Sequence, residues 1–335
     1  IRNTTVKIIG TSLIFIFIKN SSQVWLYALI LNLTQVIGQI VMWFDIPKEV
    51  KFVNPRLIEM KKHLKFSIKL FIPQMAINVY TMLDKVMLGI LTNDSQVGMY
   101  DNSQKIIKIL ITIVTTLALV TMPKMASLYK NGNRQEFENT VYRSFSFVSF
   151  LSFPMSFGLI AVCKNFIPWF YGPGFKEIKL MFYFGSWLMI TLAWSSIVGN
   201  QILISIKRQK EFTIAVTAGA IVNIVFNFVL IKRFQGVGTT ISSVIAEFTG
   251  MFIMLYFVKD IISVKKLFKS IPKYIMSSIL MFLITFNIGN FVKTNILGTC
   301  IQCVTGGVVY IIIMILVKDE NLMYAFNLIR SKKNS

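Results

Sequence analysis

The sequence predicts an all-α polytopic membrane protein with about ten transmembrane helices, and two observations carry this prediction. Hydrophobic residues make up 55% of the 335 residues and charged residues only 15%, whereas about a quarter of the residues in a soluble domain are charged. The apolar residues also occur in long blocks, such as 24–44 and 297–317, which match the roughly 20 residues that a helix needs to cross a bilayer. We therefore expect the chain to be embedded in a membrane.

Ten candidate spans follow one another, and the charges between them predict their direction. They cover residues 5–18, 24–44, 64–92, 98–122, 144–163, 180–204, 213–231, 237–257, 274–292 and 296–317. Lys and Arg in short loops accumulate on the cytoplasmic side of a membrane. With alternating loops and Arg2 inside, the inside segments hold 22 Lys and Arg and the outside segments hold seven. This asymmetry predicts that both ends of the chain are cytoplasmic.

Other features of the sequence exclude several function classes. The net charge of +21 does not indicate a nucleic-acid partner, because the basic residues lie at the ends of apolar spans, where they set topology and meet anionic membrane lipids. Cys300 and Cys303 lie inside a predicted span without a second cysteine pair, and His63 is the only histidine. We predict no metal site and no cofactor. No segment is long enough to form a soluble catalytic domain, so we do not expect an enzyme.

Polar side chains form a stripe along the third span. At 100° per residue, the side chains of Gln74, Asn78, Thr81 and Lys85 fall within about 60° of one another, and Asp84 lies on the flank of this stripe. A charge at the centre of a bilayer costs about 2.5–3.5 kcal/mol, so such residues usually face a cavity or a partner. The stripe therefore indicates a polar surface inside the protein.

The fourth span carries a second stripe, which contains Gln104, Lys105 and Lys108 together with Asp101. A short loop joins the two spans, so we interpret both stripes as walls of one hydrated cavity. The alternative is structural: Asp84 and a nearby lysine form an ion pair within the packing, or Lys105 extends to the outer membrane interface.

Two carboxylates in the spans are candidates for coupling to a proton or cation. We expect Asp84 to hold a lysine of the stripes in its charged form, since an opposite charge within about 4–6 Å favours ionisation. Glu247 lies in the eighth span, where a neighbouring Ser or Thr is an equally good explanation of how it is satisfied. Asn223 and Asn227 are one turn apart in the seventh span and are candidates for hydrogen bonds between helices.

Two segments carry a resemblance to a known family. The first is FIPQMAINVYTMLDKVMLGILTNDSQVGMYDNSQKIIKI (71–109), which contains P-Q-x-A-x-N, L-D-K-x-M-L-G, V-G-x-Y and Q-K-I. The second is AGAIVNIVFNFVLIKRFQGVGTTISSVIAEF (218–248), which covers parts of the seventh and eighth predicted spans. They resemble the bacterial polysaccharide flippases, the O-antigen and capsular repeat-unit transporters of the multidrug/oligosaccharidyl-lipid/polysaccharide exporter superfamily. The resemblance extends over nearly the whole chain.

The resemblance implies a fold of two six-helix lobes, often followed by two further helices. On this pattern the first four helices of the N-terminal lobe are missing, and we expect the chain to start partway through a longer protein. The segments are then the last two helices of the N-terminal lobe (1–44), a basic cytoplasmic linker (45–63), the C-terminal six-helix lobe (64–257), two additional helices (271–317) and a cytoplasmic tail (318–335).

The resemblance also implies a function. A flippase of this family moves a polyprenyl-diphosphate-linked oligosaccharide across the bacterial cytoplasmic membrane by alternating access, and polysaccharide polymerase or glycosyltransferase machinery is an implied partner. Lys85, Lys105 and Lys108 would meet the anionic diphosphate, and Gln74, Asn78 and Gln104 would contact the sugar. Such transport breaks no covalent bond.

Three alternatives belong to other classes. A drug/cation antiporter of the same superfamily would use carboxylates, but lysines outnumber carboxylates on the two stripes. A membrane-embedded glycosyltransferase or ligase would need a catalytic carboxylate or a large loop outside the membrane. A purely structural subunit would leave the stripes unexplained. The lipid-linked oligosaccharide remains the favoured substrate.

The predicted topology can be tested with single cysteines in a variant that lacks Cys163, Cys300 and Cys303. A cysteine in the loop 93–97 should react with a membrane-impermeant thiol reagent in intact cells. Cysteines in 45–63 or 258–273 should react only after the cells are permeabilised. Labelling of 258–273 in intact cells would reverse the orientation.

Overall fold

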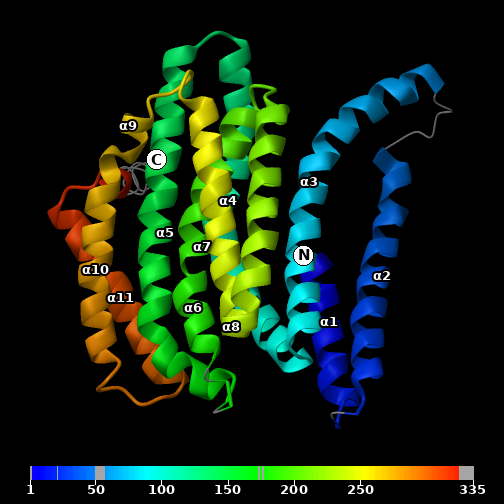
Figure 1. Cartoon of the computed structure of the whole chain (residues 1–335), viewed down its shortest axis with the longest axis vertical. Helices are drawn as coiled ribbons and strands as arrows, with labels where there is room; N and C mark the ends of the chain where they lie inside the picture. The colour runs from blue at the N-terminus through cyan, green and yellow to red at the C-terminus, as the bar shows by residue number, and fades with distance from the viewer. Residues whose placement is uncertain (1, 21, 50–56, 173, 176, 324–335) are drawn as a thin grey trace. The chain divides into compact units, whose positions relative to one another are not determined.

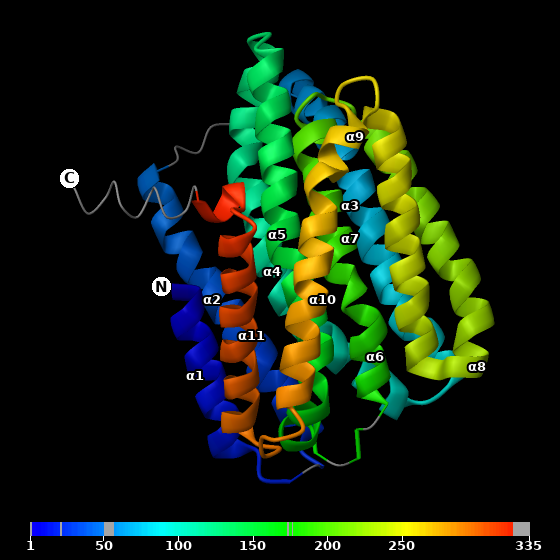
Figure 2. The same ribbon diagram turned by 90° about the vertical axis from the view of Figure 1, so that its left-hand side faces the viewer.

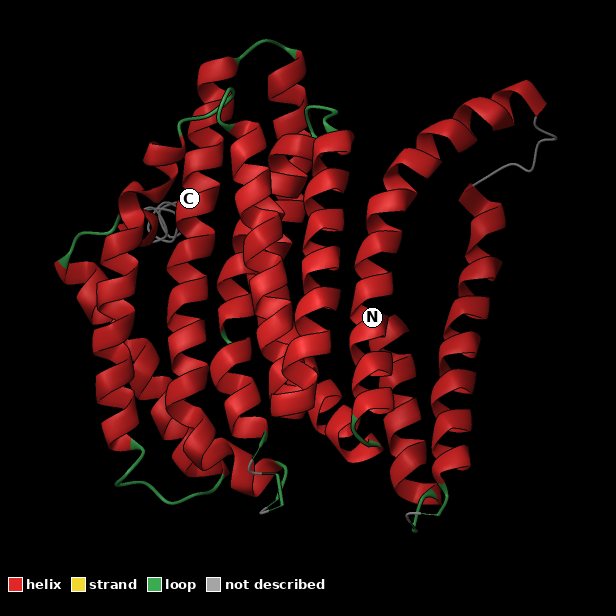
Figure 3. Ribbon diagram, in the orientation of Figure 1, coloured by secondary structure: helices red, strands yellow, loops and turns green. Residues whose placement is uncertain are grey.

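The computed structural model describes residues 2–20, 22–49, 57–172, 174–175 and 177–323, and these residues form helices joined by short loops and turns (Figure 3). No β-strand occurs within these ranges. The contacts divide the chain into two units, residues 1–65 and 66–335. The predicted all-helical membrane fold is confirmed.

The first unit is a helical hairpin made by α1 (Arg2–Phe17) and α2 (Val24–Glu49). Small residues bring these helices together: a Cβ atom on Gly10 would lie 2.9 Å from Cγ2 of Thr34. Close approach through glycine is typical of helix packing in membranes. Both α2 and α3 extend into the predicted linker 45–63, of which residues 50–56 lie outside the described ranges.

The second unit is a bundle of long helices (Figure 1). Helix α3 begins in the first unit and ends in the second. Helices α10 and α11 pack against α5 and against each other (Figure 2). In chain order the elements are α3 (Leu57–Leu91), α4 (Asp94–Lys130), α5 (Arg134–Phe170), α6 (Ile178–Gly185), α7 (Trp187–Ser195), the π-helix η1 (Ser196–Ile204), α8 (Gln209–Val258), α9 (Val264–Leu267), the 3₁₀-helix η2 (Phe268–Ser270), α10 (Ile271–Ile288) and α11 (Ile296–Leu316).

The described helices account for all ten predicted spans, apart from a few residues at their ends. Six helical segments of the described residues are long and apolar enough to cross a membrane. One of them, α8, reverses direction at Gln235, whose φ of 49° lies in the left-handed region. Its two halves pack closely, because a Cβ atom on Gly219 would lie 3.0 Å from the carbonyl oxygen of Ala246. The single element α8 therefore contains the seventh and eighth predicted spans.

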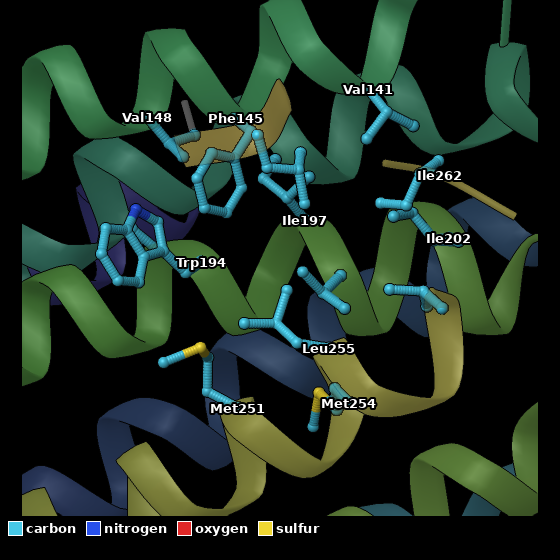
Figure 4. Packing of buried hydrophobic residues seen from close by; sticks show 14 of the residues in the cluster. Val141, Phe145, Val148, Trp194, Ile197, Ile202, Met251, Met254, Leu255 and Ile262 are labelled. Atoms are coloured by element: carbon cyan, nitrogen blue, oxygen red, sulfur yellow. The ribbon is translucent and has the colours of Figure 1, made fainter. Parts of the chain in front are cut away.

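The segment 178–204, made of α6, α7 and η1, is the most buried of these membrane-crossing segments. Inside the bundle 72% of its most apolar stretch is buried, compared with 28% for α11. It packs against α4, α5 and α8. Phe145 of α5 stacks on Trp194 of α7 with ring centroids 5.3 Å apart, and Ile197 and Leu255 lie beside them in the core (Figure 4). This segment is therefore the core element against which α4, α5 and α8 pack.

Polar groups at the ends of the helices satisfy the backbone and join the loops. Asn93 accepts a hydrogen bond from the backbone N–H of Gln96 at 3.0 Å and so caps the start of α4. At the end predicted to face the cytoplasm, the Arg208 guanidinium donates to both carboxylate oxygens of Asp260, at 3.1 and 2.5 Å. These hydrogen bonds hold the pKa of Asp260 below its usual value.

The turn of α8 gives a test of the packing. In Gly238→Ala the new Cβ atom would lie 2.4 Å from the carbonyl oxygen of Leu230, so the two halves of α8 must move apart. We expect the variant to lose about 1–3 kcal/mol of stability, measured as a lower Tm of the purified protein in detergent. The control is Gly307→Ala in α11, which meets no atom within 4 Å. An unchanged Tm for Gly238→Ala would contradict this close packing.

Candidate functional site

The residues of the two predicted stripes lie on α3 and α4, which are antiparallel and joined through Thr92 and Asn93. A turn this short brings together residues that are about equally far from it on the two helices. Asp84 therefore meets Tyr100, and Lys85 meets Asp101. Adjacent residues of a helix point about 100° apart, so these two contacts lie on different sides of the hairpin.

Asp84 lies in a buried cluster of neutral hydrogen-bond donors. Only 1% of its surface is exposed. Its Oδ1 accepts from Nδ2 of Asn227 at 2.6 Å, and its Oδ2 accepts from the hydroxyls of Tyr100 and Ser243, each at 2.9 Å. These donors come from α4 and from both halves of α8. The carboxylate thus joins three helical segments to the end of α3.

A second layer of polar atoms surrounds this cluster. Nδ2 of Asn227 also donates to Oδ1 of Asn223 at 3.2 Å, and both asparagines are completely buried. The Nδ2 atom of Asn223 and the Oδ1 atom of Asn227 have no hydrogen-bond partner among the described residues. Burying such a group without a partner costs about 1–3 kcal/mol. These two atoms therefore offer one donor and one acceptor to a further polar group beside Asp84.

The lysines have a different partner from the expected one. Lys85 forms its ion pair with Oδ1 of Asp101, and Lys105 lies 2.8 Å from Oδ2 of the same residue. Among the described residues no ammonium or guanidinium group pairs with Asp84. The prediction that Asp84 holds a lysine of the stripes in its charged form is therefore wrong, because the side chain of Asp84 turns toward α8 while that of Lys85 turns toward Asp101.

The lysine group is accessible from outside the protein, whereas the Asp84 cluster is buried. The side chains of Lys85, Lys105 and Asp101 are 43%, 62% and 28% exposed. Lys108 is also exposed, one turn of α4 beyond Lys105. Together these three lysines and one carboxylate carry a net charge of +2. They form a basic surface on helices that are otherwise largely apolar.

The remaining predicted site residues are distributed over both faces. Asn78 is exposed and Thr81 is partly buried, while Gln104 is buried, with no partner for its Nε2 among the described residues. The side chain of Gln74 lies outside the described part of the structure. Glu247 is partly buried on α8, one turn beyond Ser243. The structure does not gather the described residues among them on one face of the bundle.

Sequence reasoning missed Tyr100 and Ser243, and it left Asp101 as a member of a stripe rather than the counter-ion of the lysines. One signal was available: Asp84 and Tyr100 are separated by the same 16 residues as Lys85 and Asp101, so the tight turn at 92–93 predicts both contacts. Ser243 lies 159 residues from Asp84, and no local pattern identifies it.

An apolar cavity lies on another side of the bundle, between α4, α5, α10 and α11. Its volume is about 610 Å³. Its lining includes Leu110, Met155, Val162, Met281 and Tyr310. Within the described residues, no group of three or more His, Cys, Asp or Glu side chains is arranged to hold a metal ion.

Comparison with known proteins gives consistent findings. The family model described as "Polysaccharide biosynthesis protein" matches residues 5–180. The probable low-salt glycan biosynthesis flippase Agl15 of Haloferax volcanii is 21% identical over 258 residues, which cover 75% of this chain and 53% of the relative. The putative O-antigen transporter of Escherichia coli K12 is 21% identical over 250 residues, covering 74% and 60%.

A solved structure shows the same fold. The lipid II flippase MurJ, in an inward closed conformation, superposes with a TM-score of 0.72 at 20% sequence identity, covering 95% of this chain and 66% of MurJ. The chain spans between about half and two thirds of the length of these proteins.

The hydrogen bonds of Asp84 predict how its variants behave. Asp84→Leu leaves the buried donors of Asn227, Tyr100 and Ser243 without their acceptor, so we expect it to lose several kcal/mol of stability, at about 1–3 kcal/mol per unpaired group. Asp84→Asn keeps an acceptor for Asn227, and its amide can donate to either hydroxyl, so most of the stability should remain. The measurement is the Tm in detergent, and equal Tm values for the two variants would contradict the described cluster.

Proposed function

The chain belongs to the polysaccharide biosynthesis protein family, and from this premise we propose that it is part of a flippase that moves a polyprenyl-diphosphate-linked oligosaccharide across the membrane. Its relatives are named as a glycan biosynthesis flippase and an O-antigen transporter. The observation that carries the proposal is the accessible pair of lysines, Lys85 of α3 and Lys105 of α4, which share the carboxylate of Asp101.

The chemistry of the substrate fits this surface. A lipid-linked saccharide contains an anionic diphosphate that hydrocarbon cannot solvate. Ammonium groups provide charge and hydrogen-bond donors for phosphate oxygens. We assign this role to Lys85, Lys105 and Lys108, and we assign contacts with sugar hydroxyls to Gln74 and Asn78.

The rest of the predicted site has secondary roles in this proposal. Thr81 lies one turn before Lys85 on α3 and extends the polar surface toward the sugar. Gln104 needs a rearrangement of α4 to reach the substrate, because it is buried here. The apolar cavity of about 610 Å³ has the lining that a hydrocarbon chain requires.

We also propose the division of the chain that the family pattern implies. Residues 1–44 supply the last two helices of an N-terminal lobe, 45–63 the linker, and 64–257 the C-terminal lobe. Residues 271–317 add two helices, and 318–335 form the tail. Transport occurs by alternating access, in which the two lobes expose the lysines to one side of the membrane and then to the other. The sugar crosses the membrane without any covalent bond being broken.

Asp84 is the proposed coupling group. A carboxylate that is buried among neutral donors bears a desolvation cost while it is ionised, and binding a proton or a monovalent cation relieves that cost. Such a change also alters the hydrogen bonds that join α3 to α4 and α8. Glu247 is the second candidate, because it lies one turn from Ser243 on α8.

The proposed setting is the cytoplasmic membrane, with both ends of the chain in the cytoplasm. The distribution of 22 Lys and Arg inside against seven outside supports this orientation. Enzymes that synthesise the lipid-linked saccharide and polymerases that consume it are the proposed functional partners. Anionic membrane lipids would contact the basic residues at the cytoplasmic ends of the helices.

Charge-removing variants test the lysines. Lys85→Gln and Lys105→Gln should each reduce polysaccharide export about tenfold or more, because the diphosphate loses an opposite charge, whereas Lys→Arg variants should keep part of the activity. Export is measured as surface polysaccharide in cells that depend on this transporter, relative to the amount of membrane protein.

A matched control is Lys259→Gln. Lys259 lies over the ring of Tyr256 at 3.8 Å, at the end of the bundle predicted to be cytoplasmic. The Lys259→Gln variant should leave polysaccharide export unchanged. Normal export by both stripe variants at normal protein levels would refute the proposed site.

A further inference from the structure

One carboxylate serves two lysines on the proposed substrate surface. Oδ1 of Asp101 pairs with Lys85 of α3, and Oδ2 pairs with Lys105 of α4 at 2.8 Å. The three side chains together carry a charge of +1 and remain 28–62% exposed. The ion group is therefore open to exchange, unlike Asp84, which is 1% exposed.

Stability does not account for this arrangement. Ion pairs between exposed side chains contribute little to folding, and lysines are costly within a membrane-crossing helix. Lys85 lies six residues before the end of α3, and Asp101 lies seven residues after the start of α4. At 1.5 Å per residue, both are about 9–10 Å inside the ends of their helices. The chain therefore places three charged groups below the helix ends, where packing gains little from them.

The geometry instead matches that of a phosphate ligand. A carboxylate presents two oxygens that share one negative charge, and a phosphoryl group presents oxygens in a similar arrangement with more charge. Asp101 holds the two ammonium groups at the spacing that suits two oxygens of one anion. A phosphate that bridges both lysines competes with this carboxylate for their ammonium groups.

We propose that Asp101 is a resident counter-anion, which occupies the lysine site when it is empty and which the substrate diphosphate displaces. This inference rests on the proposed function. Asp101 acts on the substrate through the lysines: it pairs with Lys85 and Lys105 while the site is empty, and it competes with the diphosphate for both. A transport site must bind its substrate firmly enough to accept it and weakly enough to release it. Competition by Asp101 weakens the binding and so allows release.

Lys108 gives the site a direction. It lies seven residues beyond Asp101 on α4, about 10 Å further from the α3–α4 turn. Among the described residues it forms no ion pair. A diphosphate therefore meets no competing anion at Lys108, whereas at Lys85 and Lys105 it competes with Asp101. In this proposal Lys108, which lies nearer the centre of the membrane, binds the anion first. Lys85 and Lys105, which lie nearer the predicted outer end, then release it because Asp101 competes for them.

Direct binding tests this inference. The chain of residues 1–335 is purified in detergent, and the Kd and dissociation rate are measured for geranylgeranyl diphosphate, with geranylgeraniol as the uncharged control. Asp101→Asn should bind the diphosphate about five- to tenfold more tightly and release it more slowly. Asp101→Glu, which keeps the competing charge, should behave like the wild type. Inorganic pyrophosphate should compete for the site in all three proteins.

The lysine variants test the proposed substrate site, and the Asp101 variants test the counter-anion role. If the Lys85→Gln/Lys105→Gln double variant binds more weakly but Asp101→Asn binds no more tightly than the wild type, the counter-anion role is overturned and the lysine site stands. If the double variant binds as well as the wild type, the lysine site itself is refuted. Asp101→Ser provides a second neutral variant, and Tm values identify any protein that has lost its fold. A structural role for Asp101 predicts weaker binding and a lower Tm in both neutral variants, which would also overturn the inference.

Discussion

The hydrogen bonds of the buried carboxylate of Asp84 are the interaction on which the end of the α3–α4 hairpin depends. A carboxylate removed from water is tolerated only when hydrogen bonds replace its hydration. Here the replacements are Asn227, Tyr100 and Ser243. Because Asn227 and Ser243 lie on opposite sides of the reversal at Gln235, one side chain fixes α3 against both halves of α8. The position of Lys85, the next residue, follows from this constraint.

The two carboxylates of the hairpin have opposite surroundings, and these surroundings suit the different roles that we propose for them. Asp84 is buried among neutral donors, so a change in its charge must alter the packing of three helical segments. Asp101 is accessible and bound to two ammonium groups, so another anion can replace it without any change in the core. A group suited to coupling and a group suited to substrate exchange thus lie on adjacent faces of one helical hairpin.

The sequence contains enough information for the spans and the basic surface, but for the partners of the charged residues it offers only the short turn between α3 and α4. The lengths of the apolar blocks depend on the membrane alone, so the ten spans could be predicted without any knowledge of packing. The 3.6-residue repeat places Lys85 and Asn78 on one stripe. It does not say whether Asp84 or Asp101 faces the lysines, because that depends on the short turn at Thr92 and Asn93. Contacts with Ser243 depend on the path of the whole second unit and have no local signal.

Coupling between the two sites requires that each binds its ligand differently in two conformations. The connection between them is one peptide bond, since Asp84 and Lys85 are consecutive residues of α3. A change in the hydrogen bonds of Asp84 that lets this end of α3 rotate or slide relative to α8 also moves Lys85 relative to Asp101 and Lys105 on α4. Such a movement separates the two ammonium groups that the proposed phosphate ligand would bridge. The rigid geometry of a helix is therefore sufficient to link the charge of a buried carboxylate to the affinity of the proposed anion site, without a longer chain of contacts.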